Sequence, residues 1–131
     1  MIGIDTNILV RFIAHDDPSQ FQLAADFLSR LSPQSPGWVS LVTAVEVEWV
    51  LSRAYRMKRA DILRSYELLL NVNDLVFERL PLLNAALAQY ATGQAGLGDH
   101  VIALSGQAAG CVATFTFDRE AQKSAGMTLL A

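Results

Sequence analysis

The sequence predicts an α/β fold, a single three-layer domain with a mainly parallel central sheet of about five strands flanked by helices. Short apolar runs typical of strands alternate along the chain with stretches of helical periodicity. Such alternation implies crossover connections between parallel strands, with helices on both faces of the sheet. The length of 131 residues suits one domain, and a hydrophobic content of 52% indicates a chain with much buried surface. We therefore expect one domain over residues 1–131.

Each expected strand is a short apolar run, and each expected helix is a longer stretch with apolar residues at helical spacing. The run at 2–4 is the first strand, and helical patterns follow at 6–13 and 18–31. The turn-rich loop SPQSPG then leads into a strand at 37–40 and is too short to be a domain linker. The later elements are helices at 43–55, 59–70, 81–90, 98–109 and 118–124, and strands at 75–79, 112–117 and 127–130.

Net charge and cysteine content limit the possible function classes. The formal net charge of −3 gives no general electrostatic footprint for nucleic acid, so binding of a polyanion has to be local or assisted by a metal ion. Cys111 is the one cysteine and has no partner for an internal disulfide. We expect a reducing, cytoplasmic setting in which Cys111 is a small core residue.

Neither targeting nor membrane insertion is expected. No Lys or Arg precedes the N-terminal apolar run, and Asp5 interrupts that run, which argues against a signal peptide. The uncharged stretch at 80–98 contains Pro81, Asn84 and several glycines. We expect it to form a helix and a loop and not a membrane span.

Two expected strands end in a carboxylate. Asp5 follows the first strand, and Asp118 follows the strand at 112–117. Ligands of such sheets bind beyond the carboxyl ends of the strands, so both acids stand where a site is expected. Each acid, taken alone, is also suited to cap the helix that follows it.

A third acid, Glu46, falls on an apolar face of the helix at 43–55. It occupies the i+4 position of a stripe expected to face the core, whereas Glu48 falls on the far side, where a solvated acid is expected. The apolar members of this stripe are Val42, Val45, Trp49 and Val50. A competing, local interpretation is a capping box in which Glu46 pairs with Thr43 at the helix start.

A fourth acid, Asp99, is the only formally charged residue between Arg79 and Asp118. It shares a helical face with Ile102 and Ala103 in the helix at 98–109. The competing interpretation is an N-cap after Gly98, which contributes about 1 kcal/mol to helix stability.

The four acids together favour a metal site more than any of them does alone. Each begins or enters a helix that follows a strand or loop, so all four are expected at one edge of one sheet. Carboxylates at short range resist ionisation, and divalent cations remove that cost. Ligation by oxygen alone suits Mg²⁺ or Mn²⁺, whereas zinc prefers His or Cys.

Four motifs, IDTNILVRF, SLVTAVEVEWVL, GDHVIAL and TFTFDREA, resemble in order the motifs of PIN domains, most closely those of VapC-type toxins of bacterial toxin–antitoxin pairs. The resemblance covers essentially the whole chain. It implies an α/β nuclease fold and metal-dependent endoribonuclease activity. It also implies a protein that typically forms a homodimer and is neutralised by a cognate antitoxin.

Carried over residue by residue, the resemblance places the catalytic, metal-binding acids at Asp5, Glu46, Asp99 and Asp118. Supporting roles fall to Thr6 and Asn7 of the D-T-N motif and to Thr116 before the last acid. His100 departs from the apolar or aromatic residue expected after the third acid. One or two Mg²⁺ or Mn²⁺ ions then lower the pKa of a bound water and stabilise charge on the phosphate.

Three arginines are possible RNA contacts, namely Arg11, Arg53 and Arg119. Arg53 begins the basic stretch RAYRMKRADILR, which either grips phosphate or is a solvated helix end and turn. Arg11 and Arg119 either contact phosphate or pair with carboxylates. The His15-Asp16-Asp17 sequence is expected to be an exposed turn that caps the next helix. The aromatic residues Phe21, Phe27, Trp49 and Tyr55 are expected to pack in the core.

Two other functions compete with the nuclease hypothesis. A catalytically inactive PIN-like module would only bind RNA or a protein, although all four acids are present. A haloacid-dehalogenase-like phosphatase requires a second Asp two residues after the first, where this chain has Asn7.

Overall fold

The computed structural model describes residues 1–131, which form two units, Met1–Glu78 and Arg79–Ala131.

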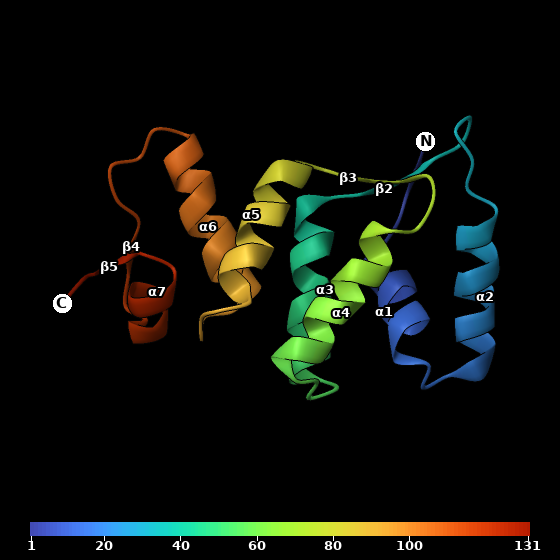
Figure 1. Ribbon diagram of the computed structural model, residues 1–131, viewed down its shortest axis with the longest axis horizontal. Helices are drawn as coiled ribbons and strands as arrows, with labels where there is room; N and C mark the ends of the chain where they lie inside the picture. The colour runs from blue at the N-terminus through green and yellow to red at the C-terminus, as the bar shows by residue number, and fades with distance from the viewer. The chain divides into compact units, whose positions relative to one another are not determined.

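The first unit has a three-stranded parallel sheet and four helices (Figure 1). The strand order is β1-β2-β3, with Gly37 of β2 opposite both Ile2 and Leu75. The strands are β1 (Ile2–Gly3), β2 (Gly37–Val39) and β3 (Leu75–Phe77). The helices are α1 (Thr6–Ala14), α2 (Pro18–Ser29), α3 (Leu41–Arg53) and α4 (Arg59–Leu70).

Polar caps fix where three of these helices begin. Asp5 caps α1, Asp17 caps α2 with Pro18 at its first position, and Ser40 caps α3 by accepting the Thr43 N–H at 3.0 Å. Glu78, directly after β3, accepts the Leu41 N–H at 2.7 Å and so ties the end of β3 to the start of α3. The sheet therefore directs both α1 and α3 away from the carboxyl ends of β1 and β2.

The core of the first unit is apolar and tightly packed. Leu9, Val39, Val47, Leu51 and Leu69 are completely buried. Gly37 is required by this packing, because a Cβ there would lie 2.6 Å from Ile4 Cδ1 and 2.9 Å from Leu31 Cδ1.

The second unit has three helices and two strands. The helices are α5 (Leu80–Tyr90), α6 (Leu97–Ala108) and α7 (Arg119–Ser124), and the strands are β4 (Phe115–Thr116) and β5 (Thr128–Leu129). Helices α5 and α6 pack against each other, and β4 and β5 pair in parallel (Figure 1). Leu83, Leu97 and Ala121 are completely buried.

The α/β class is confirmed, and every strand pairing is parallel. All seven predicted helices and five predicted strands are present, with the strands shorter than expected. None of the helices has the length and apolar character needed to span a membrane.

The predicted core face of α3 is wrong. The buried residues of α3 are Thr43, Ala44, Val47, Glu48 and Leu51. Glu46 is exposed, and so are Val42 and Trp49, whose exposed fractions are 67% and 59%. Glu48, expected in solvent, is only 6% exposed. The helix is apolar nearly all round, so its periodicity did not distinguish the two faces.

Two further predictions about side-chain burial are wrong. Trp49 does not pack in the core; the Arg53 guanidinium lies 5.9 Å from its ring centroid. Cys111 is exposed and not a core residue. Strand β4 begins only at Phe115, so Cys111 falls in the loop that follows α6, after a turn at Gly110 with φ of +92°.

Candidate active site

Asp5 lies directly beyond β1 and caps α1. Its Oδ1 accepts the Thr6 N–H at 2.7 Å, and its side chain is on the exposed surface. The predicted capping role is therefore confirmed. The cap bond uses only Oδ1, so Oδ2 is available to a ligand.

Glu46 lies in α3, well past the helix start. The predicted capping box between Thr43 and Glu46 does not form, because Ser40 is the N-cap and takes the Thr43 N–H itself. The structure thus removes the local explanation for an acid at this position.

Asp5 and Glu46 line one pocket of about 410 Å³, which we call the Asp5 pocket. Its other lining residues are Thr6, Asn7, Val10, Arg11, Val50, Ala54 and Tyr55. Asp5 is the N-cap of α1 and Glu46 is in α3, and both helices leave the carboxyl edge of the sheet. Asp5 and Glu46, which the sequence singles out, thus line the same pocket of the first unit, and their joint role in a site stays a prediction.

A buried hydroxyl beside Asp5 has no hydrogen-bond partner. Thr6 is 7% exposed, and its Oγ1 is buried without a partner. Leaving such a group unpaired costs about 1–3 kcal/mol. Thr6 follows Asp5 in the chain and lines the same pocket as Asp5 and Glu46, and oxygen donors of these kinds suit a hard divalent cation and its water.

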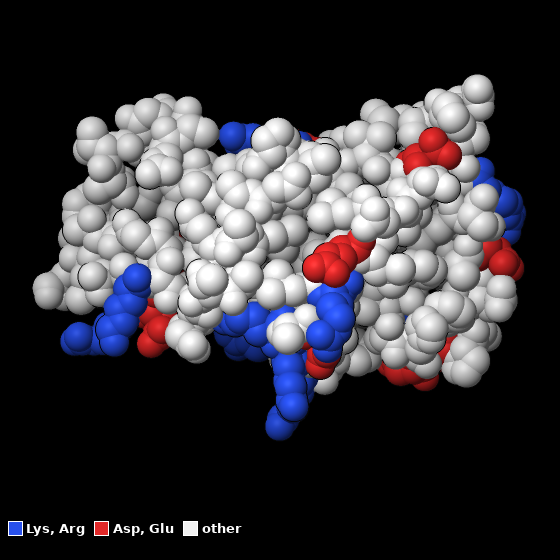
Figure 2. All heavy atoms as spheres, in the orientation of Figure 1, with Lys and Arg blue, Asp and Glu red and all other residues white.

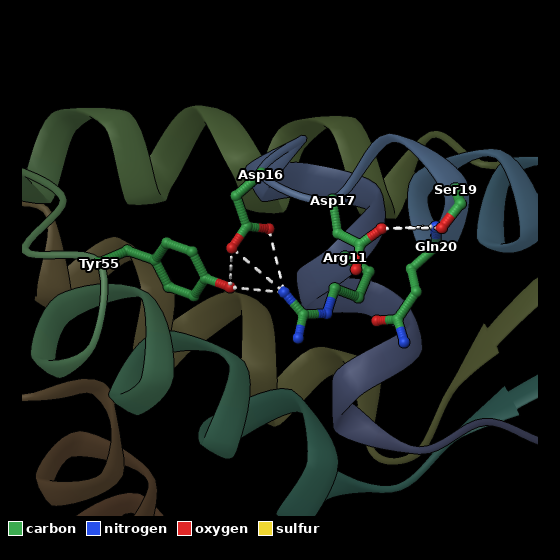
Figure 3. Close-up of polar contacts among 6 residues, drawn as sticks. All are labelled: Arg11, Asp16, Asp17, Ser19, Gln20 and Tyr55. Carbon is green, nitrogen blue, oxygen red and sulfur yellow. Dashed lines mark hydrogen bonds and ion pairs between the residues drawn. The ribbon is translucent and has the colours of Figure 1, made fainter.

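Arg11 at the wall of the Asp5 pocket is paired with Asp16. Its Nη1 lies 3.1 Å from each carboxylate oxygen of Asp16 and 3.3 Å from the Tyr55 hydroxyl, which itself donates to Asp16 at 2.9 Å (Figure 3). Of the two interpretations of Arg11, the structure therefore shows the carboxylate pair.

The pKa values in this cluster reflect the same contacts. The Tyr55 hydrogen bond, followed by Arg11, lowers the pKa of Asp16, and the Asp16 hydrogen bond raises the pKa of Arg11. Burial, followed by the Asp16 hydrogen bond, raises the pKa of Tyr55. The ion pair and the neutral phenol are thus the stable forms near neutral pH.

The turn before α2 has the expected capping role. Asp17 accepts the Gln20 N–H at 3.1 Å and the Ser19 hydroxyl at 3.0 Å, and these bonds lower its pKa. The sequence offered a carboxylate partner for Arg11 without identifying it as Asp16, and it missed Tyr55, because residues 44 positions apart in the chain carry no local signal for their contact.

Asp99 and Asp118 belong to the second unit. Asp118 caps α7, with Oδ1 accepting the Glu120 N–H at 2.8 Å, and its own N–H donates to Thr116 Oγ1 at 3.0 Å. Asp99 is not an N-cap: α6 begins at Leu97 after Gly96, and Asp99 lies half-buried in the first turn. An acid in this turn suits the helix dipole.

The burial of His100 accounts for its departure from the family pattern. It is completely buried, and its Nδ1 lies 2.9 Å from Gln89 Oε1 of α5. The ring therefore fills a core position, as an apolar residue would. Neither unit by itself gathers three or more His, Cys, Asp or Glu side chains into a group that could hold a metal ion.

Basic residues of the stretch RAYRMKRADILR form an exposed surface at the α3–α4 connection (Figure 2). Arg53, Arg56 and Lys58 are exposed there, whereas Arg64 pairs with Asp61 on α4. Arg119 is the exposed first residue of α7. Arg53 directly precedes Ala54 and Tyr55, which line the Asp5 pocket, but is not itself a lining residue.

In an α/β fold, ligands bind beyond the carboxyl ends of the parallel strands, where Asp5 lies. The family model of the PIN domain matches residues 2–126, and the chain belongs to the PIN domain family. This family generally has a nuclease fold, and its members usually require divalent metal ions. A search of curated proteins found no match.

Proposed function

We propose that this protein is a metal-dependent endoribonuclease that hydrolyses RNA phosphodiester bonds at four carboxylates, Asp5, Glu46, Asp99 and Asp118. The observation that carries the proposal is the Asp5 pocket, which is lined by Asp5 at the N-cap of α1, by Glu46 of α3 and by Thr6, whose buried hydroxyl has no hydrogen-bond partner. The direct test is incubation of the purified protein with defined RNAs in Mg²⁺ or Mn²⁺ and in chelator. Cleavage is expected only with the metal.

We further propose that one PIN domain spans residues 1–131 and that Asp99 and Asp118 complete the metal site. The family match at 2–126, which includes residues of both units, supports this proposal. Hard divalent ions are held by several oxygen ligands, so Asp5 and Glu46 are a partial set.

The metal, Mg²⁺ or Mn²⁺, would be held by these carboxylates, with Asp5 and Asp99 as the primary ligands. When bound, such an ion lowers the pKa of a water molecule and stabilises charge on the phosphate. The hydrogen bond from the Thr6 N–H restrains the Asp5 side chain through Oδ1 and leaves Oδ2 available to a ligand. Thr6, Asn7 and Thr116 are proposed to orient water and the neighbouring carboxylates.

Replacing Thr6 by Val tests the role of the buried hydroxyl. We expect Thr6→Val to raise the metal-free unfolding free energy by about 1 kcal/mol, because it removes an unpaired buried hydroxyl and keeps the shape of the side chain. Cleavage is expected to fall by roughly 10- to 100-fold, as for other groups that orient a metal site. Chemical denaturation and single-turnover cleavage measure the two effects. A variant that is less stable and fully active would contradict this role.

Metal binding is expected to stabilise the fold. A ligand at 100 times its dissociation constant adds about 2.7 kcal/mol to the unfolding free energy. We expect thermal melting to shift upward with Mn²⁺ concentration in the unmodified protein and to lose this dependence in Asp5→Asn. Asp17→Asn, which changes the same residue type at the cap of α2, should keep the shift.

We propose that the physiological role is that of a VapC-type toxin in the cytoplasm, acting as a homodimer and neutralised by a cognate antitoxin. The order of the four sequence motifs supports this role. Induced expression should arrest growth, co-expression of an adjacent small gene should relieve the arrest, and Asp5→Asn should be harmless. Arrest by Asp5→Asn to the same degree would contradict a nuclease toxin.

A further inference from the structure

Arg11 lies at a wall shared by two cavities of the first unit. It lines the Asp5 pocket with Asp5 and Glu46, and it also lines a groove of about 510 Å³ between α1 and α2. Its side chain is 35% exposed. A cation at this position adjoins the carboxylates without being one of their ion-pair partners.

All the side-chain hydrogen bonds of Arg11 involve one guanidinium nitrogen, Nη1. Nη1 donates to both Asp16 oxygens and to the Tyr55 hydroxyl, while Nη2 points away from both residues (Figure 3). The edge formed by Nε and Nη2 is therefore available. This edge presents two parallel N–H donors and matches the two oxygens of a phosphate.

Three separate segments hold the guanidinium in place. Arg11 is in the last turn of α1, Asp16 is in the turn before α2, and Tyr55 follows α3. The hydrogen bond of 2.9 Å from the Tyr55 hydroxyl to Asp16 completes a cluster of three side chains around Nη1. Fixing a long side chain before a ligand arrives lowers the entropy lost on binding.

We propose that Arg11 binds one phosphate of the single-stranded RNA substrate through Nε and Nη2. In this proposal Asp16 and Tyr55 are positioning residues, which hold the Arg11 guanidinium in a fixed orientation at the wall of the Asp5 pocket. This inference rests on the proposed function, since it deepens the description of the same site. The competing explanation is structural: the cluster would only join the α1–α2 turn to the end of α3, and Arg11 would add nothing but bulk positive charge.

A double-mutant cycle separates these explanations. The affinity for a fluorescent single-stranded RNA is measured in chelator, where the RNA stays intact. Tyr55→Phe changes no charge, and we expect it to weaken binding by roughly 3- to 10-fold, since it removes a hydrogen bond that orients a charged group. In an Arg11→Gln background the same change should have no further effect. An equal loss in both backgrounds, or no loss with Arg11 present, would overturn the proposal.

Two more substitutions test geometry against charge. Arg11→Lys keeps the charge and loses the paired donors, so its affinity should fall close to that of Arg11→Gln. Arg11→Gln should also make the slope of log affinity against log salt less negative by about 0.7. Arg64→Gln is the matched control, because Arg64 pairs with Asp61 and lines neither cavity. A loss as large in Arg64→Gln, or unchanged affinity in Arg11→Lys, would refute the proposal.

The outcome is independent of catalysis. If the protein binds RNA without cutting it, the proposed nuclease function is refuted, but the RNA affinities of the double-mutant cycle can still be measured and compared. A protein that cuts RNA while the two substitutions behave additively refutes only the positioning role. Thermal melting of each variant confirms that it is folded.

Discussion

Asp5→Asn is expected to abolish Mg²⁺-dependent RNA cleavage, with a loss of at least roughly 100-fold, since even partners outside the ligand shell of a metal contribute 10- to 100-fold. The substitution removes a charged oxygen ligand and keeps the size of the side chain. Asn is as good an N-cap as Asp, so α1 should still begin at Thr6. The measurement is the single-turnover cleavage rate at saturating protein.

The same variant should be more thermally stable than the unmodified protein in chelator. The proposed site brings carboxylates together, and removing one of them relieves their repulsion when no cation is present. Asp17→Asn is the matched control, because Asp17 also caps a helix of the first unit and lines neither the Asp5 pocket nor the α1–α2 groove. It should leave cleavage unchanged. An Asp5→Asn protein that melts at a lower temperature in chelator and still cuts RNA would refute the role given to Asp5.

Asp99→Asn is the second substitution with a large expected effect. Asp99 is in the second unit, yet we expect its loss to reduce cleavage by at least roughly 100-fold, because the proposal makes it a ligand of the same metal site as Asp5. The double variant Asp5→Asn/Asp99→Asn should be little slower than either single variant. Residues that act as one unit in catalysis show such non-additive effects.

Glu120→Gln serves as the control for Asp99→Asn. Glu120 lies in the first turn of α7, as Asp99 lies in the first turn of α6, and it has no assigned role at the site. Full cleavage is expected in Glu120→Gln. Multiplicative losses in the double variant, or full activity in Asp99→Asn, would mean that the two acids do not share a site.

The positions of the elements could be predicted because periodicity and turn residues are local properties. All helices and strands appear where the sequence placed them, and α4 matches its predicted bounds at both ends. The capping roles of Asp5, Asp17 and Asp118 are confirmed for the same reason. A cap depends on the residue and on the two or three amides that follow it.

Which face of a helix is buried was harder to predict, because burial depends on the elements that pack against that helix. Helix α3 carries apolar residues on nearly every side, and the buried stripe that includes Glu48 was not evident from spacing alone. One buried contact there comes from α4: the Tyr66 hydroxyl accepts the Glu48 backbone N–H at 3.0 Å. The sequence contains no local trace of this bond or of the Arg11–Tyr55 contact.

The candidate site was predicted in part. The sequence singled out Asp5 and Glu46, and the structure places both in the Asp5 pocket. It also shows that Glu46 has no capping role and that Asp99 is not an N-cap, so two local explanations are removed. The unpaired Thr6 hydroxyl became apparent only from the packing around it.

The most direct test of the account is a crystal grown with Mn²⁺ and measured at the manganese absorption edge. We expect an anomalous peak with oxygen atoms of Asp5 and Asp99 about 2.1 Å away, the distance typical of a small hard cation. Glu46 and Asp118 should face the same peak. A map in which no manganese binds beside Asp5, or in which Asp99 and Asp118 point elsewhere, would contradict it.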